Sequence, residues 1–193
     1  MKYAIILLNM ERKHNPANAK EKPRIITLVV GLGNPGAEYE NTYHNIGFST
    51  VDFLTNYEHF SLSRSKTFTS LEKDGIRFIK PLTFMNDSGR AVVDALHYFK
   101  KKSEHMCIIH DDIDVPVGSY KLQFARGAAG HHGVESIAST LDSTAFWRIR
   151  IGIGKESPLG EKMRASSLVL SPITKSDQNA FMEVFKEIKE LLF

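Results

Sequence analysis

The chain has 193 residues, of which 42% are hydrophobic and 24% are charged. These values are ordinary for a globular protein and exclude wholesale disorder. A chain of this length favours a single domain that is large enough to bury a real core. The formal net charge of +3 is too small to indicate a nucleic-acid partner by itself, although it would not repel one.

Cys107 is the only cysteine, and it lies in the apolar run of residues 106–109. A disulfide within the chain is therefore excluded, and we expect this thiol in the core rather than as a nucleophile. No apolar run approaches the ~18 residues of a membrane-spanning helix. The sequence therefore predicts a cytoplasmic protein without a membrane partner.

The first 24 residues differ from the rest of the chain. Residues 3–8 are apolar, but they lead into charged residues rather than a small-residue cleavage site, so a secretory signal is not predicted. Residues 11–24 are polar and contain Pro16 and Pro23, which indicates a flexible arm. An added edge strand at residues 3–8 and an over-extended gene start are the alternatives. We therefore separate an N-terminal extension, residues 1–24, from a folded domain, residues 25–193.

From residue 25 onward the pattern alternates between strands and helices. Residues 25–30 form a continuous, mostly β-branched run followed by glycine, which is typical of a strand buried on both faces. Further strands are expected at residues 76–79, 106–109, 120–124 and 147–153, and the last two should have one wetter face.

Helices are predicted by apolar residues at helical spacing. They are expected at residues 47–57, from a cap at Asp87 or Ser88 to Phe99, at residues 134–141, and along residues 181–192. No internal repeat appears. The expected fold is a single α/β domain with a mixed twisted sheet flanked by helices.

Polar residues gather directly after the first strand. The turn GLGNPG at residues 31–36 is followed by YENTYHNIG at residues 39–47, where the carboxyl ends of strands hold ligands in open α/β sheets. His44 could accept a proton there near neutral pH, although a lone histidine is more often structural. The turn also matches the dinucleotide pattern G-x-G-x-x-G, but Pro35 interrupts it and no amphipathic helix follows. We expect these glycines to let the backbone turn tightly, so that Asn34 points over the strand ends.

Three later clusters are also rich in functional groups. Residues 83–89 contain an apolar pair, Phe84 and Met85, that we expect to be exposed, and Asn86 as a donor and acceptor; a simple helix cap is the alternative. Residues 110–114 read HDDID, which could bind Mg²⁺, but strand alternation separates Asp111 from Asp112, so a shared metal is not required. The small-residue loop of residues 127–133 could be a mobile lid or an anion site.

The order of these clusters resembles bacterial-type peptidyl-tRNA hydrolases. The matching strings are VGLGNPG at residues 30–36, YENTYHNIG at 39–47, PLTFMNDSG at 81–89, HDDIDVPVG at 110–118 and RIRIGIG at 148–154. The resemblance spans about residues 25–170, which is nearly the whole folded part.

The resemblance implies hydrolysis of the ester that joins a peptide to the 3′-terminal ribose of tRNA, without metal or cofactor, by a monomer. By that likeness His44 is the general base that activates water, Asp111 orients it, and Asn34 completes the catalytic set. The residues implied in substrate binding are Tyr39, Phe84, Met85, Asn86, His131 and His132. Candidates for phosphate contacts are Arg126, Arg148 or Arg150, Lys162 and Arg164, because tRNA binding should be largely electrostatic.

The chain departs from the family pattern at several positions. Tyr43 stands where the family usually has arginine, His132 where it has asparagine, and Glu135 where it has a base. We expect weaker tRNA binding with the hydrolytic centre retained. The chain also ends before the family's last segment, which leaves open how the C-terminus packs and bears less on catalysis. The alternatives are an RNA-binding relative that has lost activity and a nicotinamide-dependent oxidoreductase.

Overall fold

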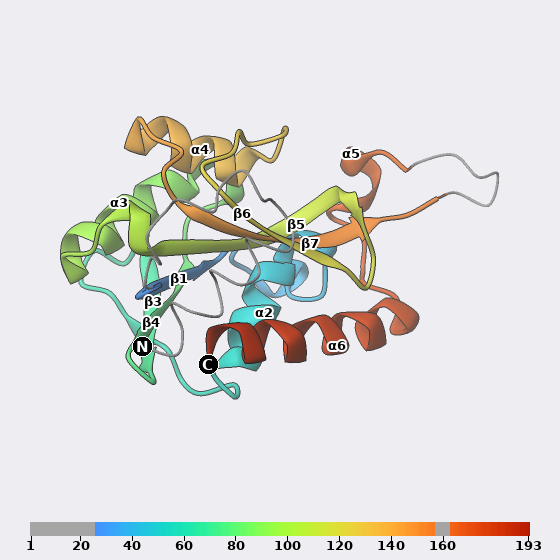
Figure 1. The fold of residues 1–193 in the computed structure, drawn as a ribbon, viewed down its shortest axis with the longest axis horizontal. Helices are drawn as coiled ribbons and strands as arrows, with labels where there is room; N and C mark the ends of the chain where they lie inside the picture. Colours follow the sequence, from blue (N-terminus) through green and yellow to red (C-terminus); the bar gives the residue numbers. More distant parts are fainter. Residues whose placement is uncertain (1–25, 157–162) are drawn as a thin grey trace, which may run out of the picture.

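The computed structural model describes residues 26–156 and 163–193, as a sheet with helices on both faces (Figure 1). The predicted extension, residues 1–24, and the candidate Lys162 lie outside the described residues. The strands are β1 (Leu28–Gly31), β2 (Ser61–Leu62), β3 (Phe68–Lys73), β4 (Ile76–Pro81), β5 (Met106–Pro116), β6 (Tyr120–Phe124) and β7 (Trp147–Gly154).

The seven strands lie in the order β2-β3-β4-β1-β5-β7-β6. Strands β4, β1, β5 and β7 run parallel, and the outer pairs β2–β3, β3–β4 and β6–β7 are antiparallel. The predicted mixed sheet is therefore confirmed. The parallel arrangement brings the carboxyl ends of β4, β1, β5 and β7 to one edge, where the polar clusters follow.

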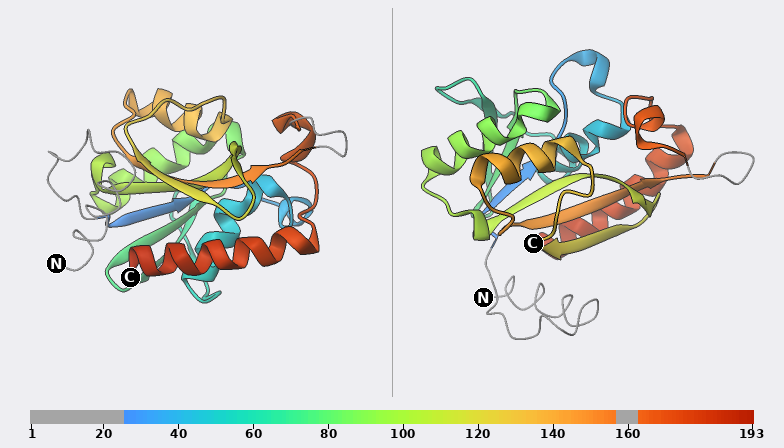
Figure 2. Two further views of the ribbon diagram at one scale, coloured as in Figure 1. Left: turned by 45° about the vertical axis from the view of Figure 1, so that its right-hand side comes forward. Right: turned by 90° about the horizontal axis from the view of Figure 1, so that it is seen from above.

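The helices cover both faces of the sheet (Figures 1 and 2). They are α2 (Ile46–Leu54), α3 (Ser88–Phe99), α4 (His132–Leu141), α5 (Ala165–Leu168) and α6 (Lys175–Leu192). Helices α3 and α4 pack on one face around Leu28, Val30 and Ile108. Helices α2 and α6 pack on the other, around Val29, Cys107 and Ile109. Each strand thus sends alternate side chains into two cores.

Several expectations about the strands need correction. Of the hairpin formed by β3 and β4, the sequence predicts only β4. Strand β3 is missed because its mixed polar and apolar residues lack a strong alternation. Strand β5 runs on through the acidic residues to Pro116. Strand β7 lies between β5 and β6 and is mostly buried; its two partly exposed residues, Arg150 and Gly154, fall on one face, which is the wetter face that was expected.

Helix α3 begins without the predicted side-chain cap. Asp87 is the residue before the helix, but its carboxylate accepts hydrogen bonds from Arg90 at 2.6 and 2.9 Å rather than from backbone amides. The Ser88 hydroxyl donates to the Met85 carbonyl at 2.8 Å. A short 3₁₀ turn, η4 (Met85–Asp87), leads into α3 and replaces a cap formed by either side chain.

Two glycines let α2 approach the sheet closely. A Cβ atom on Gly31 would lie 2.3 Å from the Gly47 carbonyl oxygen, and one on Gly47 would lie 2.4 Å from the Ile109 carbonyl oxygen. The turn after β1 continues into two 3₁₀ turns, η2 (Ala37–Tyr39) and η3 (Tyr43–Asn45), rather than into an amphipathic helix. The glycines therefore serve close packing and a tight turn, and the geometry of a dinucleotide fingerprint is not formed.

The C-terminal helix α6 packs with its apolar face in the core. Its apolar side chains form the predicted stripe: Phe181, Val184, Phe185, Ile188, Leu191 and Leu192 are all buried. The ring of Phe193 stacks on Phe78 of β4, with 6.2 Å between centroids. Within the part of the chain that the structure describes, no helix has the length and apolarity needed to cross a membrane.

Candidate active site

His44 lies in the 3₁₀ turn η3, directly before α2 and beside the end of β5. Its backbone amide donates to the Val169 carbonyl at 2.8 Å, and the amide of Tyr43 donates to the Ser171 carbonyl at 3.3 Å. The segment between α5 and α6 therefore supports the turn from outside. The side chain of His44 is 10% exposed, so its ring is mostly shielded from solvent but a part of it is accessible at the surface.

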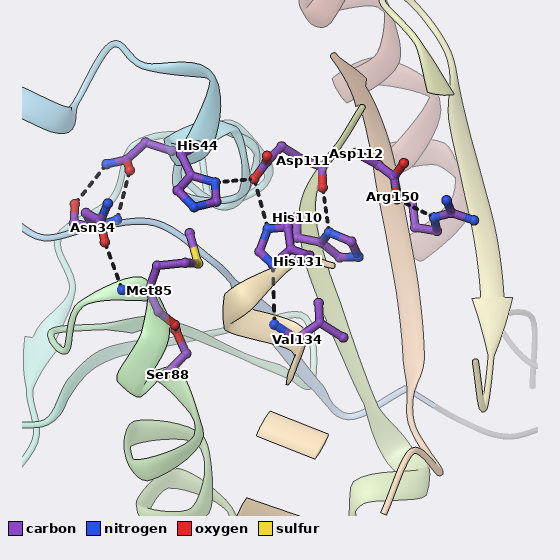
Figure 3. Close-up of polar contacts among 11 residues, drawn as sticks. Asn34, His44, Met85, Ser88, His110, Asp111, Asp112, His131, Val134 and Arg150 are labelled. Carbon is purple, nitrogen blue, oxygen red and sulfur yellow. Dashed lines mark hydrogen bonds and ion pairs between the residues drawn. The ribbon is translucent and has the colours of Figure 1, made fainter. Parts of the chain in front are cut away.

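Asp111 lies between two histidines (Figure 3). Its Oδ1 is 2.8 Å from His44 Nδ1 and 3.0 Å from His131 Nε2. Because a carboxylate only accepts hydrogen bonds, both ring nitrogens must donate to it. A neutral His44 ring then carries its lone pair on Nε2, the atom that faces away from Asp111.

The second nitrogen of His131 is also used. Nδ1 accepts a hydrogen bond from the Val134 amide at 3.3 Å, which makes His131 the N-cap of α4. An acceptor at Nδ1 and a donor at Nε2 define one neutral tautomer of His131. The sequence assigned His131 to the substrate, whereas the structure places it in the hydrogen-bond network of Asp111.

Asp111 is ionised in this setting. Its burial alone would raise the pKa of the carboxyl, but favourable electrostatic interaction with His131 and His44, together with the hydrogen bonds that both rings donate, holds that pKa far below its ordinary range. Only 3% of the side chain is exposed, so the carboxylate does not depend on water for its stabilisation. A fixed negative charge therefore lies against His44 Nδ1.

His110 is a buried neighbour that the sequence did not single out. Its ring packs edge-on against His131 with 4.5 Å between centroids, and its Nδ1 lies 2.6 Å from the Asp111 carbonyl oxygen. Its Nε2 has no hydrogen-bond partner among the described residues. Burial, followed by unfavourable electrostatic interaction with His131, lowers the pKa of His110 well below its ordinary value, so this ring is neutral.

Asn34 is fixed over the strand ends, as predicted. Its Oδ1 accepts from the Met85 amide at 2.8 Å, which joins the turn after β1 to the start of η4. Asn45 bonds to the backbone of Asn34 twice: its Oδ1 accepts from the amide at 2.8 Å, and its Nδ2 donates to the carbonyl at 2.9 Å. Since Oδ1 of Asn34 is occupied, its Nδ2 is the atom available to a substrate oxygen. Asn45 was quoted in the motif but not chosen as a site residue; its place beside His44 was the available signal.

Phe84 and Met85 do not form the expected exposed pair. Phe84 is 57% exposed and meets the ring of Tyr39 edge-on at 6.3 Å, but Met85 is only 5% exposed. Met85 packs into the core because Gly133 has no side chain and leaves room for it: a Cβ on Gly133 would lie 2.5 Å from the Met85 Sδ. Asn86 is exposed at the surface of η4. Four members of the predicted substrate group are therefore accessible: Tyr39, Phe84, Asn86 and His132.

Unlike His131, its neighbour His132 and several charged side chains lie apart from the buried network. His132 begins α4 with its side chain 76% exposed, and its Nδ1 is 3.9 Å from Glu135 Oε2. Arg126 and Arg164 are exposed at the surface. The structure thus leaves these four groups accessible to a large ligand.

The two arginines of β7 have different surroundings. Arg148 is 1% exposed and donates from Nη2 to the Gly127 carbonyl at 2.9 Å; burial lowers its pKa to about 10. Arg148 is buried and supports the glycine-rich loop, so the prediction that it contacts phosphate directly is wrong. Arg150 donates from Nε to Asp112 at 2.6 Å and from Nη1 to Gln123 at 2.9 Å, which orients its guanidinium near the surface. As predicted, Asp112 faces away from Asp111.

A further cluster beside His44 was missed. The hydroxyl of the buried Tyr43 donates to Asp177 near the start of α6 and accepts from Lys155 after β7. Lys155 also forms an ion pair with Asp177. Burial alone would raise the pKa of Asp177, but hydrogen bonds from Lys155 and Tyr43 lower it. Tyr43 is more than 100 positions from each of its two partners, so no local pattern could have joined them.

Cys107 is buried in β5, and burial raises the pKa of its thiol to about 12, so it is a core residue as expected. Among the described residues, His44, Asp111 and His131 form the one group with metal-ligand spacing, with their atoms within 4.8 Å of one another. Their mutual hydrogen bonds account for this spacing without an ion.

The whole described domain matches one family of known proteins. A family model described as "Peptidyl-tRNA hydrolase" matches residues 28–192. The chain belongs to the peptidyl-tRNA hydrolase family. Curated relatives of that name include one from Citrifermentans bemidjiense, 40% identical over 163 residues that cover 81% of this chain and 84% of the relative. A relative of the same name from Bordetella petrii is 35% identical over 173 residues, covering 86% and 82% of the two chains.

Solved structures give the same family. A crystal structure of peptidyl-tRNA hydrolase from Acinetobacter baumannii superimposes with a TM-score of 0.74 at 32% identity, covering 86% of this chain and 85% of that one. A complex of peptidyl-tRNA hydrolase with N-propanol gives a TM-score of 0.73 at 33% identity. This peptidyl-tRNA hydrolase family member is thus an enzyme that hydrolyses peptidyl-tRNA, and the single α/β domain expected from the sequence is confirmed.

Proposed function

We propose that His44 is the general base of this hydrolase and that Asp111 positions it. The observation that carries the proposal is the hydrogen bond from His44 Nδ1 to the buried, ionised Asp111, which leaves Nε2 of His44 to accept a proton. A fixed carboxylate stabilises the imidazolium that forms during the reaction. His131, bonded to the same Oδ1, restrains the carboxylate from the other side.

The reaction follows from this geometry. A water molecule gives one proton to His44 Nε2 while its oxygen attacks the carbonyl carbon of the ester. The tetrahedral intermediate then breaks the bond to the ribose oxygen, which takes the proton back from His44. The products are a peptide with a free carboxylic acid, which ionises by giving its proton to solvent, and a tRNA with a free terminal hydroxyl. Neutral His44 is restored at the end of the cycle.

The amide groups near His44 are suited to hold the reacting carbonyl. Asn34 has Nδ2 available, because its Oδ1 is fixed by the Met85 amide. Such a donor stabilises the developing oxyanion when it is held in advance. Asn86 would position the terminal adenosine or the peptide carbonyl. Tyr39 and Phe84 offer aromatic surface beside it.

The nucleic-acid part of the substrate would lie on the other side of His44, towards β6, β7 and the glycine-rich loop before α4. Arg126, Arg150 and Arg164 supply positive charge, and His132 lies at the exposed start of α4. Phosphate contacts of this kind make binding depend on salt concentration. We also propose that the protein acts as a cytoplasmic monomer; light scattering during gel filtration tests its oligomeric state.

The test is release of peptide from N-acetyl-aminoacyl-tRNA with EDTA present. We expect turnover by the parent protein and a loss of about 10³-fold or more in His44→Ala. His97→Ala is the matched control, because His97 is exposed on α3 and far from the site in sequence. Equal activity in parent and His44→Ala would overturn the assignment of the base. Activity that disappears with EDTA and returns with a divalent ion would overturn the metal-free mechanism.

A further inference from the structure

The backbone of η3, the turn that carries His44, is paired with residues 169–173 along its outer side. Two amides of the turn donate to carbonyls of this segment, at 2.8 and 3.3 Å. Directly before the turn, Thr42 forms an antiparallel bridge with Pro172. The position of the His44 backbone therefore depends on this segment, which leads into α6.

The side chain of Tyr43, next to His44 in the turn, reaches the start of α6. Its ring is 1% exposed and meets the ring of Phe181 edge-on, with 6.2 Å between centroids. Its hydroxyl oxygen lies 3.4 Å from the Thr174 amide, which donates to it, and the hydroxyl donates to Asp177. Thr174 is the cap of α6, and Asp177 lies in its first turn. Tyr43 thus bonds the turn of the proposed base to the beginning of α6.

Opposite charges fix the direction of the Tyr43 hydroxyl. It accepts from Lys155 and donates to Asp177, and these two form an ion pair with each other. The Lys155 ammonium also lies 4.7 Å from the centroid of the Tyr43 ring. Burial alone would lower the pKa of Lys155, but hydrogen bonds to Asp177 and Tyr43 raise it, so the lysine is charged at neutral pH. A hydroxyl held between a cation and an anion has one favourable orientation.

Such a polar cluster does more for geometry than for stability. The side chains of Lys155 and Asp177 are only 23% and 13% exposed, so the cost of their desolvation offsets much of their attraction. Apolar side chains of similar volume would anchor α6 about as well, but apolar burial has no preferred direction. Hydrogen bonds are directional, so they hold the Tyr43 ring in one place relative to α6.

The bond between His44 and Asp111 depends on an accurate placement of the turn. Figure 3 shows the His44 ring directed at Asp111, and its Nδ1 lies 2.8 Å from Oδ1. A shift of the turn by about 1 Å would lengthen this distance beyond that of a hydrogen bond. Misplacement of a reacting group by about 1 Å can lower a rate by about 10²-fold. Small movements of η3 therefore matter for catalysis even where the fold is intact.

We propose that Tyr43, Lys155 and Asp177 position His44 for catalysis by tying η3 to the first turn of α6. Tyr43 is a positioning residue and not a catalytic one, because its ring is buried and closed to the substrate. The proposal rests on the proposed function, in which His44 is the general base. It predicts that the Tyr43 hydroxyl contributes to kcat and not to substrate binding.

Tyr43→Phe tests the proposal, since it removes the hydroxyl and keeps the buried ring. The assay is release of peptide from N-acetyl-aminoacyl-tRNA by the full chain, with kcat and KM measured separately. We expect kcat to fall about tenfold and KM to change less than about twofold. Lys155→Met, which removes the cation at a partly exposed position, should act in the same way and serves if Tyr43→Phe does not fold. Tyr98→Phe, the same substitution at an exposed position of α3, is the matched control and should change neither kcat nor KM.

Two further variants separate positioning from a loss of stability. Ile188→Ala should destabilise α6 away from the Tyr43 hydroxyl, and at a temperature where this variant is folded its kcat should equal that of the parent. Tyr43→Phe combined with Asp111→Asn should lose less activity than the product of the two single losses, because both changes weaken the same hydrogen bond of His44.

Four results would each overturn the positioning role. They are an unchanged kcat in Tyr43→Phe and Lys155→Met, a loss confined to KM, an equal kcat loss in Ile188→Ala, and losses that multiply in the double variant. Failure of the proposed function is distinct, because His44→Ala would then keep the rate of the parent.

Discussion

Replacing Asp111 with asparagine removes one charge from the network while keeping the shape of the side chain. Asp111 Oδ1 accepts from His44 Nδ1 at 2.8 Å, and the side chain is 3% exposed. When His44 becomes protonated in the transition state, the two charge centres lie about 4 Å apart. At an effective dielectric constant near 20, this attraction is about 4 kcal/mol.

Asparagine retains part of that stabilisation. Its amide oxygen can still accept from His44 Nδ1, and a neutral hydrogen bond contributes about 1 kcal/mol. The net loss of transition-state stabilisation in Asp111→Asn is therefore about 3 kcal/mol, which corresponds to a fall of about 10²-fold in kcat. KM should change less than about threefold, because the buried carboxylate does not reach the substrate.

The assay is the initial rate of peptide release from N-acetyl-aminoacyl-tRNA at saturating and subsaturating substrate. Asp114→Asn, the same substitution at an exposed position of β5, is the control and should remain near the parent rate. Circular dichroism and thermal unfolding check that the variant is folded. A loss of less than fivefold in kcat, or a loss confined to KM, would refute the role given to Asp111.

Three further outcomes are expected. Glu135→Lys, alone and with His132→Asn, should tighten tRNA binding by about three- to tenfold at low salt, and an unchanged affinity in filter binding would contradict the expected weakening at these positions. Asp177→Asn should lower the urea midpoint at pH 7. The folded pKa of Asp177 is lowered, so its carboxylate stabilises the fold above the ordinary carboxyl pKa, and this stabilisation is lost as pH falls through the folded pKa. The difference in urea midpoint between parent and variant should therefore shrink near pH 3. An equal difference at pH 7 and pH 3 would argue against the ion pair with Lys155. Ile188→Ala should cost about 2–5 kcal/mol of unfolding free energy, because Ile188 is 0% exposed, whereas Lys186→Ala on the outer face of α6 should change stability by less than about 0.5 kcal/mol.

The sequence by itself determined the family, the alternation of strands and helices, and the side chains at the strand ends. Continuous β-branched runs predict the buried strands, and the apolar stripe predicts α6, because both patterns are local in the sequence. The placement of Asn34 and His44 after β1 and of Asp111 after the apolar part of β5 followed from the rule that ligands gather at the carboxyl ends of parallel strands. Strand alternation also separated Asp111 from Asp112 correctly.

Only the tertiary structure decided which of these groups touch. Met85 looked exposed beside Phe84, but Gly133, nearly 50 positions later, leaves the space that its side chain fills. His131 joined Asp111 because the loop before α4 folds back over β5, and Tyr43 found Asp177 because α6 returns beneath the sheet. Contacts between residues distant in sequence depend on the order of the strands and on the packing of the helices. The spacing of side chains along the chain predicts neither the strand order nor the helix packing.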